Sequence, residues 1–204
     1  MTILPPDDFQ QRKKKIREQA HANRNAQANK DELSRQNCAT FMSLPEYAAA
    51  KTVLFYVDAR SEVRTRHSLP AALQHGKRIV VPYCVANELE LFLLTNMEEL
   101  AIGAFKILEP KPELRALPEK KVAVQEIDLI MVPGVAFDRT GARMGHGFGY
   151  YDRLLEHARP ETPLVALAFE CQLFPEVPTL PHDVHMDKII TEKAVYSGKG
   201  RALG

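Results

Sequence analysis

The chain has 204 residues, 45% of them hydrophobic and 26% charged, and its formal net charge is +1. This length suits one domain with a real core, and the near-zero charge gives no electrostatic case for nucleic acid or an anionic membrane as a partner. No apolar run approaches the roughly 18 residues of a membrane-spanning helix, and the N-terminus lacks the basic and apolar segments of a signal peptide, so we expect a cytoplasmic protein.

The first half of the chain predicts two helices and then an alternation of strands and helices. Residues 9–29 are rich in Gln, Arg, Lys and Ala, which favour helices, and a second helical stretch covers 30–42. Short apolar runs of strand type follow. We expect strands at 52–57, 77–82 and 89–94, a helix at 65–75 that ends before Gly76, and a turn or brief helix up to Leu100.

The second half continues this alternation after a proline-rich loop at 109–120. Near-continuous apolar strands separated by helices indicate a mostly parallel sheet covered on both faces. The predicted fold class is therefore α/β, with three layers and N-terminal helices, in a single domain over 1–196 and a disordered tail over 197–204. The expected elements are strands at 127–132, 163–169 and 188–191 and a helix at 149–158.

A glycine-rich loop is the most informative segment. Five of the ten glycines fall between residues 134 and 149. Glycine allows positive φ and the close approach of a ligand, and successive free N–H groups form a nest suited to phosphate, next to the start of a helix. Arg143 supplies a full positive charge, and Asp152 supplies an oxygen that could hold Mg²⁺ beside phosphate. Three of the glycines stand at alternate positions, namely Gly145, Gly147 and Gly149.

The spacing of these glycines is weak evidence by itself. It differs from the dinucleotide fingerprint and from the Walker A loop, so a turn without any ligand remains an alternative. The position of the loop supports a site, because ligands bind at the carboxyl ends of parallel strands. The loop directly follows the 127–132 strand, while Glu62 follows the first strand and Tyr83 the second, so these ends can converge on one cleft.

The segment from Pro133 to Leu155 resembles the signature of the 5-formyltetrahydrofolate cyclo-ligase family, which reads roughly Pro-Gly-x-x-Phe-Asp, two residues, and then Gly-x-Arg-Leu-Gly-x-Gly-x-Gly-Tyr-Tyr-Asp. Met144 replaces the usual leucine. Phe148 stands where the family often has glycine or lysine, and a phenyl ring cannot make a lysine's contact with phosphate. Other family-like features follow in the right order from residue 9 to residue 195: Lys13 and Arg17, Glu62, 103–110, Gln172, and His182 with Asp183.

This resemblance implies an ATP- and Mg²⁺-dependent ligase of folate one-carbon metabolism. Its substrate would be 5-formyltetrahydrofolate and its product 5,10-methenyltetrahydrofolate. ATP would phosphorylate the formyl oxygen, N10 would attack the same carbon, and ADP and phosphate would be released. The partners would then be two small molecules, and we expect a monomer or a weak homodimer.

The residues and the resemblance together assign roles at the site. Arg143 and Asp152 would be catalytic, and Asp152 and Asp183 would bind the metal. Glu62 would accept hydrogen bonds from the pterin ring. The ATP-binding residues would be Lys13, Arg17, Gly134, Arg143, Gly145, His146, Gly147, Phe148, Gly149, Tyr150 and Tyr151. The substrate-binding residues would be Val57, Glu62, Gly147, Phe148, Gly149 and Tyr150.

Alternatives stay open for residues and for function. A sugar-phosphate isomerase would bind phosphate at the same loop without ATP, and a non-catalytic folate-binding protein would keep the site without turnover. Phe148 leaves the second rival open, whereas Arg143, Asp152 and Glu62 argue for activity. Each residue also has a simpler interpretation without a ligand. Lys13 and Arg17 would form a solvated basic face, and Asp152 would be a carboxylate at a helix start. Asp183 would be a turn residue, and one of Tyr150 and Tyr151 would pack in the core.

Overall fold

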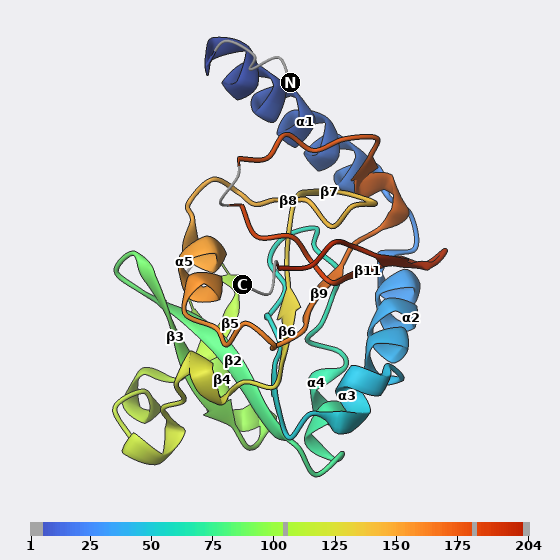
Figure 1. The fold of residues 1–204 in the computed structure, drawn as a ribbon. Coiled ribbons are helices and arrows are strands. Elements are labelled where there is room, and N and C mark those ends of the chain that lie inside the picture. Colours follow the sequence, from blue (N-terminus) through green and yellow to red (C-terminus); the bar gives the residue numbers. More distant parts are fainter. Residues whose placement is uncertain (1–5, 104–105, 181–182, 202–204) are drawn as a thin grey trace.

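The computed structural model describes residues 6–103, 106–180 and 183–201. The main sheet consists of β1 (Thr52–Leu54), β2 (Arg78–Val85), β3 (Glu88–Leu94), β6 (Leu129–Val132), β9 (Leu164–Leu167), β11 (Lys188–Ile190) and β12 (Val195–Ser197). These seven strands lie in the order β12-β11-β9-β6-β1-β2-β3 (Figure 1). The five inner strands are parallel, and the edge strands β12 and β3 are antiparallel to their neighbours. The predicted mostly parallel sheet is confirmed.

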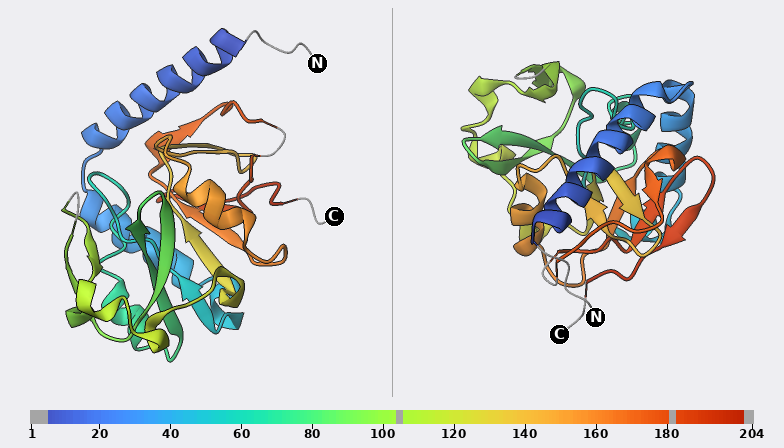
Figure 2. Two further views of the ribbon diagram at one scale, coloured as in Figure 1. Left: turned by 90° about the vertical axis from the view of Figure 1, so that its left-hand side faces the viewer. Right: turned by 90° about the horizontal axis from the view of Figure 1, so that it is seen from above.

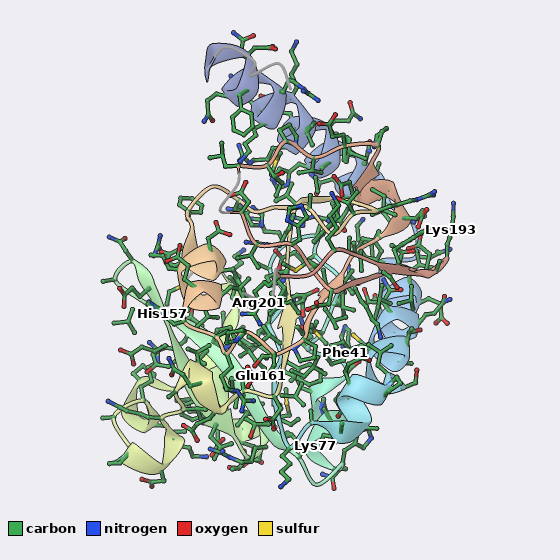
Figure 3. All side chains as sticks on the ribbon, in the orientation of Figure 1. Phe41, Lys77, His157, Glu161, Lys193 and Arg201 are labelled. Atoms are coloured by element: carbon green, nitrogen blue, oxygen red, sulfur yellow. The ribbon has the colours of Figure 1, made fainter. Side chains whose placement is uncertain are left out.

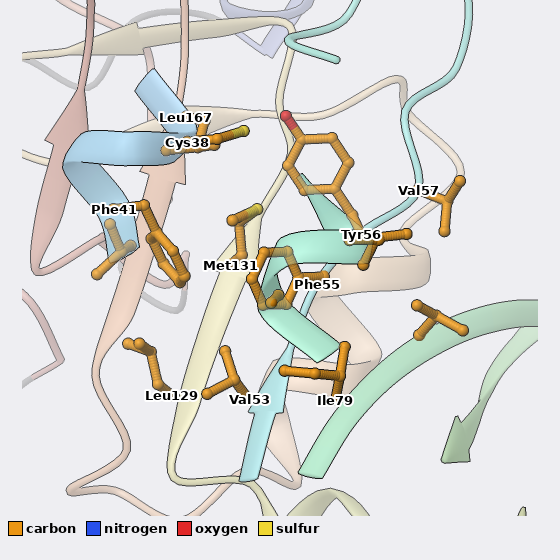
Figure 4. Close-up of a cluster of buried hydrophobic side chains, with 14 of the residues drawn as sticks. Cys38, Phe41, Val53, Phe55, Tyr56, Val57, Ile79, Leu129, Met131 and Leu167 are labelled. Atoms are coloured by element: carbon orange, nitrogen blue, oxygen red, sulfur yellow. The ribbon is translucent and has the colours of Figure 1, made fainter. Parts of the chain in front are cut away.

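Helices cover both faces of this sheet. Because side chains alternate along a strand, Val53 lies in the core on one face, and the next residue, Leu54, lies in the core on the other. Figure 4 shows the first core, where Val53 and Met131 of the strands lie near Phe41. This face is covered by α2 (Lys30–Met42), α3 (Pro45–Ala49) and α4 (Leu69–Leu73), and the other by α5 (Tyr150–Glu156). The three-layer α/β prediction is therefore confirmed.

The first helix, α1 (Pro6–Ala26), packs on a second, smaller sheet. That sheet has the order β10 (Leu173–Phe174), β7 (Ala136–Asp138) and β8 (Arg143–Met144). Ala20 of α1 lies in a small apolar cluster with Ala136 and Met144, and Figures 1 and 2 show α1 along this end of the molecule. In the described ranges, no helix is both long and apolar enough to cross a membrane.

Two predicted segments differ from the structure in a way that physical contacts explain. The helix expected at 65–75 is reduced to α4, because the Thr65 hydroxyl donates to the Tyr56 carbonyl at 2.5 Å and holds its own residue in a loop. The segment 109–120, predicted as a loop, begins within β5 (Leu108–Pro110), which pairs with β4 (Leu100–Ile102). The two strands form a short hairpin, and strands of three residues are too short to show an alternating pattern in the sequence.

The tail is bound to the body of the molecule as far as residue 201. Ser197 ends β12, and beyond it the Gly198 N–H donates to the Asp187 carbonyl at 2.8 Å. The Arg201 guanidinium, which lies near Glu161 in Figure 3, donates to the carbonyls of Arg159 and Thr162 at 2.7 and 2.6 Å. The expectation of disorder is therefore wrong for 197–201, and 202–204 lie outside the described residues.

Candidate active site

The glycine-rich loop connects β8 to α5. Gly147 and Gly149 have φ values of 98° and 70°, a left-handed conformation that glycine adopts without strain. The loop does not directly follow the 127–132 strand as predicted, because the hairpin of β7 and β8 intervenes. It still lies at the carboxyl end of β6, since Arg143 Nη1 donates to the Pro133 carbonyl at 3.3 Å. Because α5 has only seven residues, charged side chains must supply most of the positive potential.

Arg143 and Asp152 form an ion pair beside this loop. The side chain of Arg143 is only 5% exposed, while that of Asp152 is 63% exposed. Burial lowers the pKa of the Arg143 guanidinium, and the Asp152 carboxylate opposes this shift. Within the described residues, Arg143 Nε is buried and has no hydrogen-bond partner. A buried cation with a donor to spare is suited to a phosphate oxygen.

Cationic residues of α1 line the other side of the loop. Arg17 Nε donates to the Gly145 carbonyl at 3.2 Å, and its guanidinium lies 3.8 Å from where a Cβ on Gly147 would stand. Lys13 Nζ lies 3.5 Å from Asp183 Oδ2. The structure therefore places both predicted α1 residues at the loop and its neighbouring segment, rather than on a fully solvated face.

The loop also contacts the segment that follows the first strand. Glu62 is buried, and its Oε1 lies 3.1 Å from His146 Nε2, while its Oε2 accepts the Ala59 N–H at 2.8 Å. Val57, the predicted ring-packing residue, is buried in the main core. The predicted substrate carboxylate and the centre of the predicted nucleotide loop thus lie in direct contact.

The two tyrosines after the loop have different surroundings. Tyr151 packs against both main cores, and burial raises the pKa of its hydroxyl, with Glu62 adding to the shift. Tyr150 lies with the 72% exposed Phe148, their ring centres 6.2 Å apart. Tyr150 is thus the ring available to a ligand at the surface of the loop, while Tyr151 lies beneath it.

The two predicted metal ligands flank the same cation. Asp152 pairs with Arg143, and Asp183 also acts electrostatically on that guanidinium. Across the part of the chain that the structure describes, no group of three or more His, Cys, Asp or Glu side chains could hold a metal. The two carboxylates of Asp152 and Asp183 suit Mg²⁺, because this ion is usually held by one or two carboxylates together with phosphate oxygens and water. His182, noted beside Asp183 in the sequence, lies outside the described residues.

Sequence reasoning missed His21 and Arg24 on α1. The His21 and His146 ring centres lie 5.3 Å apart, and the buried Arg24 donates to Ser61 Oγ and to the Gly134 carbonyl. The helical spacing could have revealed them. His21 lies four residues after Arg17, which lies four after Lys13, and Arg24 follows three residues later, so the four side chains share one helix face. Gly134, predicted to bind ATP, also accepts from Gln172 Nε2 at 3.1 Å, so its carbonyl serves to fix the turn after β6.

The chain is similar to known proteins over most of its length. The 5-formyltetrahydrofolate cyclo-ligase family matches residues 9–192. A probable 5-formyltetrahydrofolate cyclo-ligase of Schizosaccharomyces pombe is 31% identical over 179 residues, which cover 81% of this chain and 86% of the relative. The 5-formyltetrahydrofolate cyclo-ligase of Mycolicibacterium smegmatis is 33% identical over 150 residues, or 71% and 75% of the two chains. The NMR structure of Aquifex aeolicus 5,10-methenyltetrahydrofolate synthetase is 32% identical, covers 96% of each chain and has a TM-score of 0.77.

Proposed function

Because the chain belongs to the 5-formyltetrahydrofolate cyclo-ligase family, we propose that it converts 5-formyltetrahydrofolate to 5,10-methenyltetrahydrofolate while ATP becomes ADP and phosphate. The observation that carries the nucleotide assignment is the buried Arg143 guanidinium, whose Nε has no partner among the described residues. It lies beside a loop whose glycines Gly145 and Gly147 are close to the guanidinium groups of Arg143 and Arg17.

The nucleotide side of the site is formed by the loop and by α1. Arg143 lies close to Gly145 at the start of the loop, and Arg17 donates to the Gly145 carbonyl. Lys13 adds a third positive charge at Asp183. These cations offset the charge of the triphosphate, and the backbone N–H groups of the loop bind its oxygens. The loop residues assigned to ATP are Gly145, His146, Gly147, Phe148, Gly149, Tyr150 and, beneath the loop, Tyr151.

The ion pair of Arg143 and Asp152 also supports a metal-dependent reaction. Asp152 and Asp183 would hold Mg²⁺ together with phosphate oxygens and water, and when bound the metal would neutralise charge on the phosphates. Asp152 is largely exposed, so its second oxygen is accessible from the loop side. The Arg143 contact holds this carboxylate in place before any ligand arrives.

The folate side is formed around Glu62. A carboxylate can accept hydrogen bonds in pairs, and the amino and N–H groups of a pterin present two donors side by side. Val57 would pack on the ring, and Tyr150 would stack on the part of the folate that reaches the loop. Gly147, Phe148 and Gly149 would contact the same ligand from the loop.

The reaction needs correct positioning more than a reactive side chain. The formyl oxygen on N5 attacks the γ-phosphorus, which gives ADP and a phosphorylated imidate. N10 then attacks the imidate carbon, loses its proton, and phosphate leaves as the ring closes. Phosphate is a good leaving group and a formamide oxygen is a poor one, so ATP is needed. Orientation and charge neutralisation supply the catalysis, as in other phosphoryl transfers.

The non-catalytic rival rests on Phe148, which brings no charge to the loop. Arg17 weakens this rival, because its guanidinium lies close to Gly147, the preceding residue. A cation is therefore present at this part of the loop, although it comes from α1. The isomerase rival offers no role for Lys13 and Arg17 together with two carboxylates.

The deciding test mixes the protein with 5-formyltetrahydrofolate and MgATP and follows the near-ultraviolet absorbance of the methenyl product. We expect a rise that requires ATP and Mg²⁺. Tight folate binding without a rise would favour the non-catalytic rival. Neither turnover nor binding would mean that the loop serves another phosphate ligand, which an assay with sugar phosphates would then address.

A further inference from the structure

The guanidinium of Arg153 joins two segments that are far apart in the sequence. Arg153 Nη1 donates to the Phe148 carbonyl, in the glycine-rich loop, at 3.2 Å. Its Nη2 donates to the Asn87 carbonyl, at the tip of the hairpin between β2 and β3. The guanidinium carbon also lies 5.5 Å from the centre of the Tyr150 ring. One side chain therefore contacts the loop, the hairpin tip and a predicted site residue.

The backbone on both sides of Arg153 fits this contact. A Cβ on Gly149 would lie 2.7 Å from Arg153 Nη1, so any side chain at that position would displace the guanidinium. At the hairpin tip, Ala86 has a φ of 51°, which residues other than glycine rarely adopt. The Tyr150 hydroxyl reaches the Ala86 carbonyl at 3.5 Å. The loop and the hairpin thus both contact Arg153, and Tyr150 adds a further contact to the hairpin.

The hairpin and the loop are two separate elements at the proposed active site, and the loop is assigned contacts with both ligands. Strand β2 pairs with β1, and Tyr83 of β2 lies in the same buried cluster as Val57, on the proposed folate side. The loop contacts Arg17, on the proposed nucleotide side. Arg153 therefore links the element beside the folate to the element beside ATP.

Below this link, β3 and α5 lie next to each other (Figure 1). A hollow of about 510 Å³ is lined by Leu89 and Leu91 of β3 and by Leu154 of α5. Leu91 and Leu154 also belong to one buried cluster, so the two elements pack against each other beside this hollow. The tip of the hairpin is held to the loop and α5 by the hydrogen bonds of Arg153 and Tyr150.

We propose that Arg153 is a positioning residue that couples the binding of the two substrates. A nucleotide that orders the loop fixes the position of the Phe148 carbonyl. Arg153, which donates to this carbonyl, is then also fixed, and its second hydrogen bond restricts the position of Asn87 in the hairpin. By linkage, each substrate then tightens the binding of the other by the same factor. A guanidinium can serve both carbonyls because its donors form a rigid fork, whereas a lysine ammonium is a single point charge. The inference rests on the proposed function, which defines the two sides.

The test measures 5-formyltetrahydrofolate binding by calorimetry, with and without Mg²⁺ and a β,γ-imido analogue of ATP that does not transfer phosphate. In the wild-type protein we expect the analogue to tighten folate binding by about fivefold or more, the range of ordinary coupled sites. In Arg153→Ala and Arg153→Lys, each ligand alone should bind within about twofold of wild type, and the coupling factor should approach one. Arg139→Ala is the matched control, because Arg139 also lies over a tyrosine ring, that of Tyr196, but belongs to the turn between β7 and β8.

Unchanged coupling in Arg153→Ala, or coupling retained in Arg153→Lys, would overturn the inference. An equal loss of both single-ligand affinities would also overturn it, since that is the result of a merely structural role. The proposed function is judged separately by turnover of the wild-type protein. An active enzyme without coupling rejects only the role of Arg153, whereas a protein that neither turns over nor binds the two ligands rejects both proposals.

Discussion

The Nε2 atom of His146 lies 3.1 Å from Oε1 of Glu62, although the two residues are 84 positions apart in the sequence. The glycine-rich loop therefore touches the carboxylate that follows the first strand. In the proposed reaction, the γ-phosphate must come within bonding distance of the formyl oxygen. Two ligand sites that share a contact between their central residues meet this requirement, and two separate sites would not.

Arg143→Ala tests the phosphate role of the loop. The substitution removes the buried cation next to Gly145, and we expect kcat to fall by about 10²- to 10³-fold, as when one charge-stabilising donor is lost. The circular dichroism spectrum should stay that of the wild type, because the partner left behind, Asp152, is exposed to solvent. Asp152→Ala should also abolish turnover, while Glu156→Ala, one turn further along α5, should not. Wild-type rates in either site variant would reject the assignment.

Arg17→Ala and Lys15→Ala separate the loop-facing side of α1 from its solvated side. Arg17 contacts the Gly145 carbonyl, whereas Lys15, two positions away, is exposed. We expect Arg17→Ala to raise the KM for ATP by about tenfold, the effect of one charge-assisted contact, with the KM for folate changed much less. Lys15→Ala should leave both values unchanged. Similar effects of the two substitutions would indicate a general effect of helix charge.

Local signals in the sequence predicted the main elements well. The helix over Lys30–Met42 has the predicted bounds, since its residues favour a helix without distant partners. The mostly parallel sheet and its two covered faces follow from the alternation of apolar strands and helices. The small sheet of β7, β8 and β10 was missed, because strands of two or three residues are too short to show an alternating pattern, and β10 pairs with a strand far back in the chain.

The candidate site shows the same division between local and long-range information. Glu62 and the loop could be placed at the carboxyl ends of the expected parallel strands from the sequence alone. Arg24 could have been found from the helical spacing on α1, but its bonds to Ser61 and Gly134 could not. The contact between Arg153 and Asn87 joins segments whose sequences carry no sign of each other.

Glu62→Ala tests the pterin role of the buried carboxylate. The substitution removes an acceptor for two ligand donors, and hydrogen bonds to a charged group contribute about 1.5–3 kcal/mol. We expect the folate Kd to rise by about 10- to 150-fold, while the Kd of the ATP analogue changes little. Glu62→Gln keeps one acceptor oxygen, so its folate Kd should lie between those of the wild type and Glu62→Ala. Calorimetry of each ligand alone gives these values, and an equal loss of both affinities would contradict the role.

Removal of metal should stop turnover without weakening the fold. The described residues hold no cluster of three metal-ligating side chains, so Mg²⁺ alone should not raise the melting temperature. MgATP should raise it, because a ligand at 100 times its Kd adds about 2.7 kcal/mol to the free energy of unfolding. Differential scanning fluorimetry with EDTA, Mg²⁺, ATP and MgATP distinguishes these cases. A clear shift with Mg²⁺ alone would indicate a site formed by protein ligands only.

His21 should make the stability of the fold depend on pH. Burial lowers the pKa of His21 below its ordinary value of 6.5, and the nearby Arg24, His146, Arg60 and Arg17 add to the shift. As the pH falls below 6.5, the unfolded chain binds a proton that the folded chain resists, so the free energy of unfolding decreases until the folded pKa is passed.

His21→Gln removes this titration, so the decrease in its free energy of unfolding from about pH 7 to about pH 5, the range in which histidine titrates, should be smaller than that of the wild type. Urea unfolding at a series of pH values measures this. His67→Gln is the matched control, because the His67 side chain is 43% exposed and its Nε2 lies 3.3 Å from the Asp31 carboxylate. Parallel pH profiles for wild type and His21→Gln would show that the partly buried His21 imidazole does not set the acid limit of the fold.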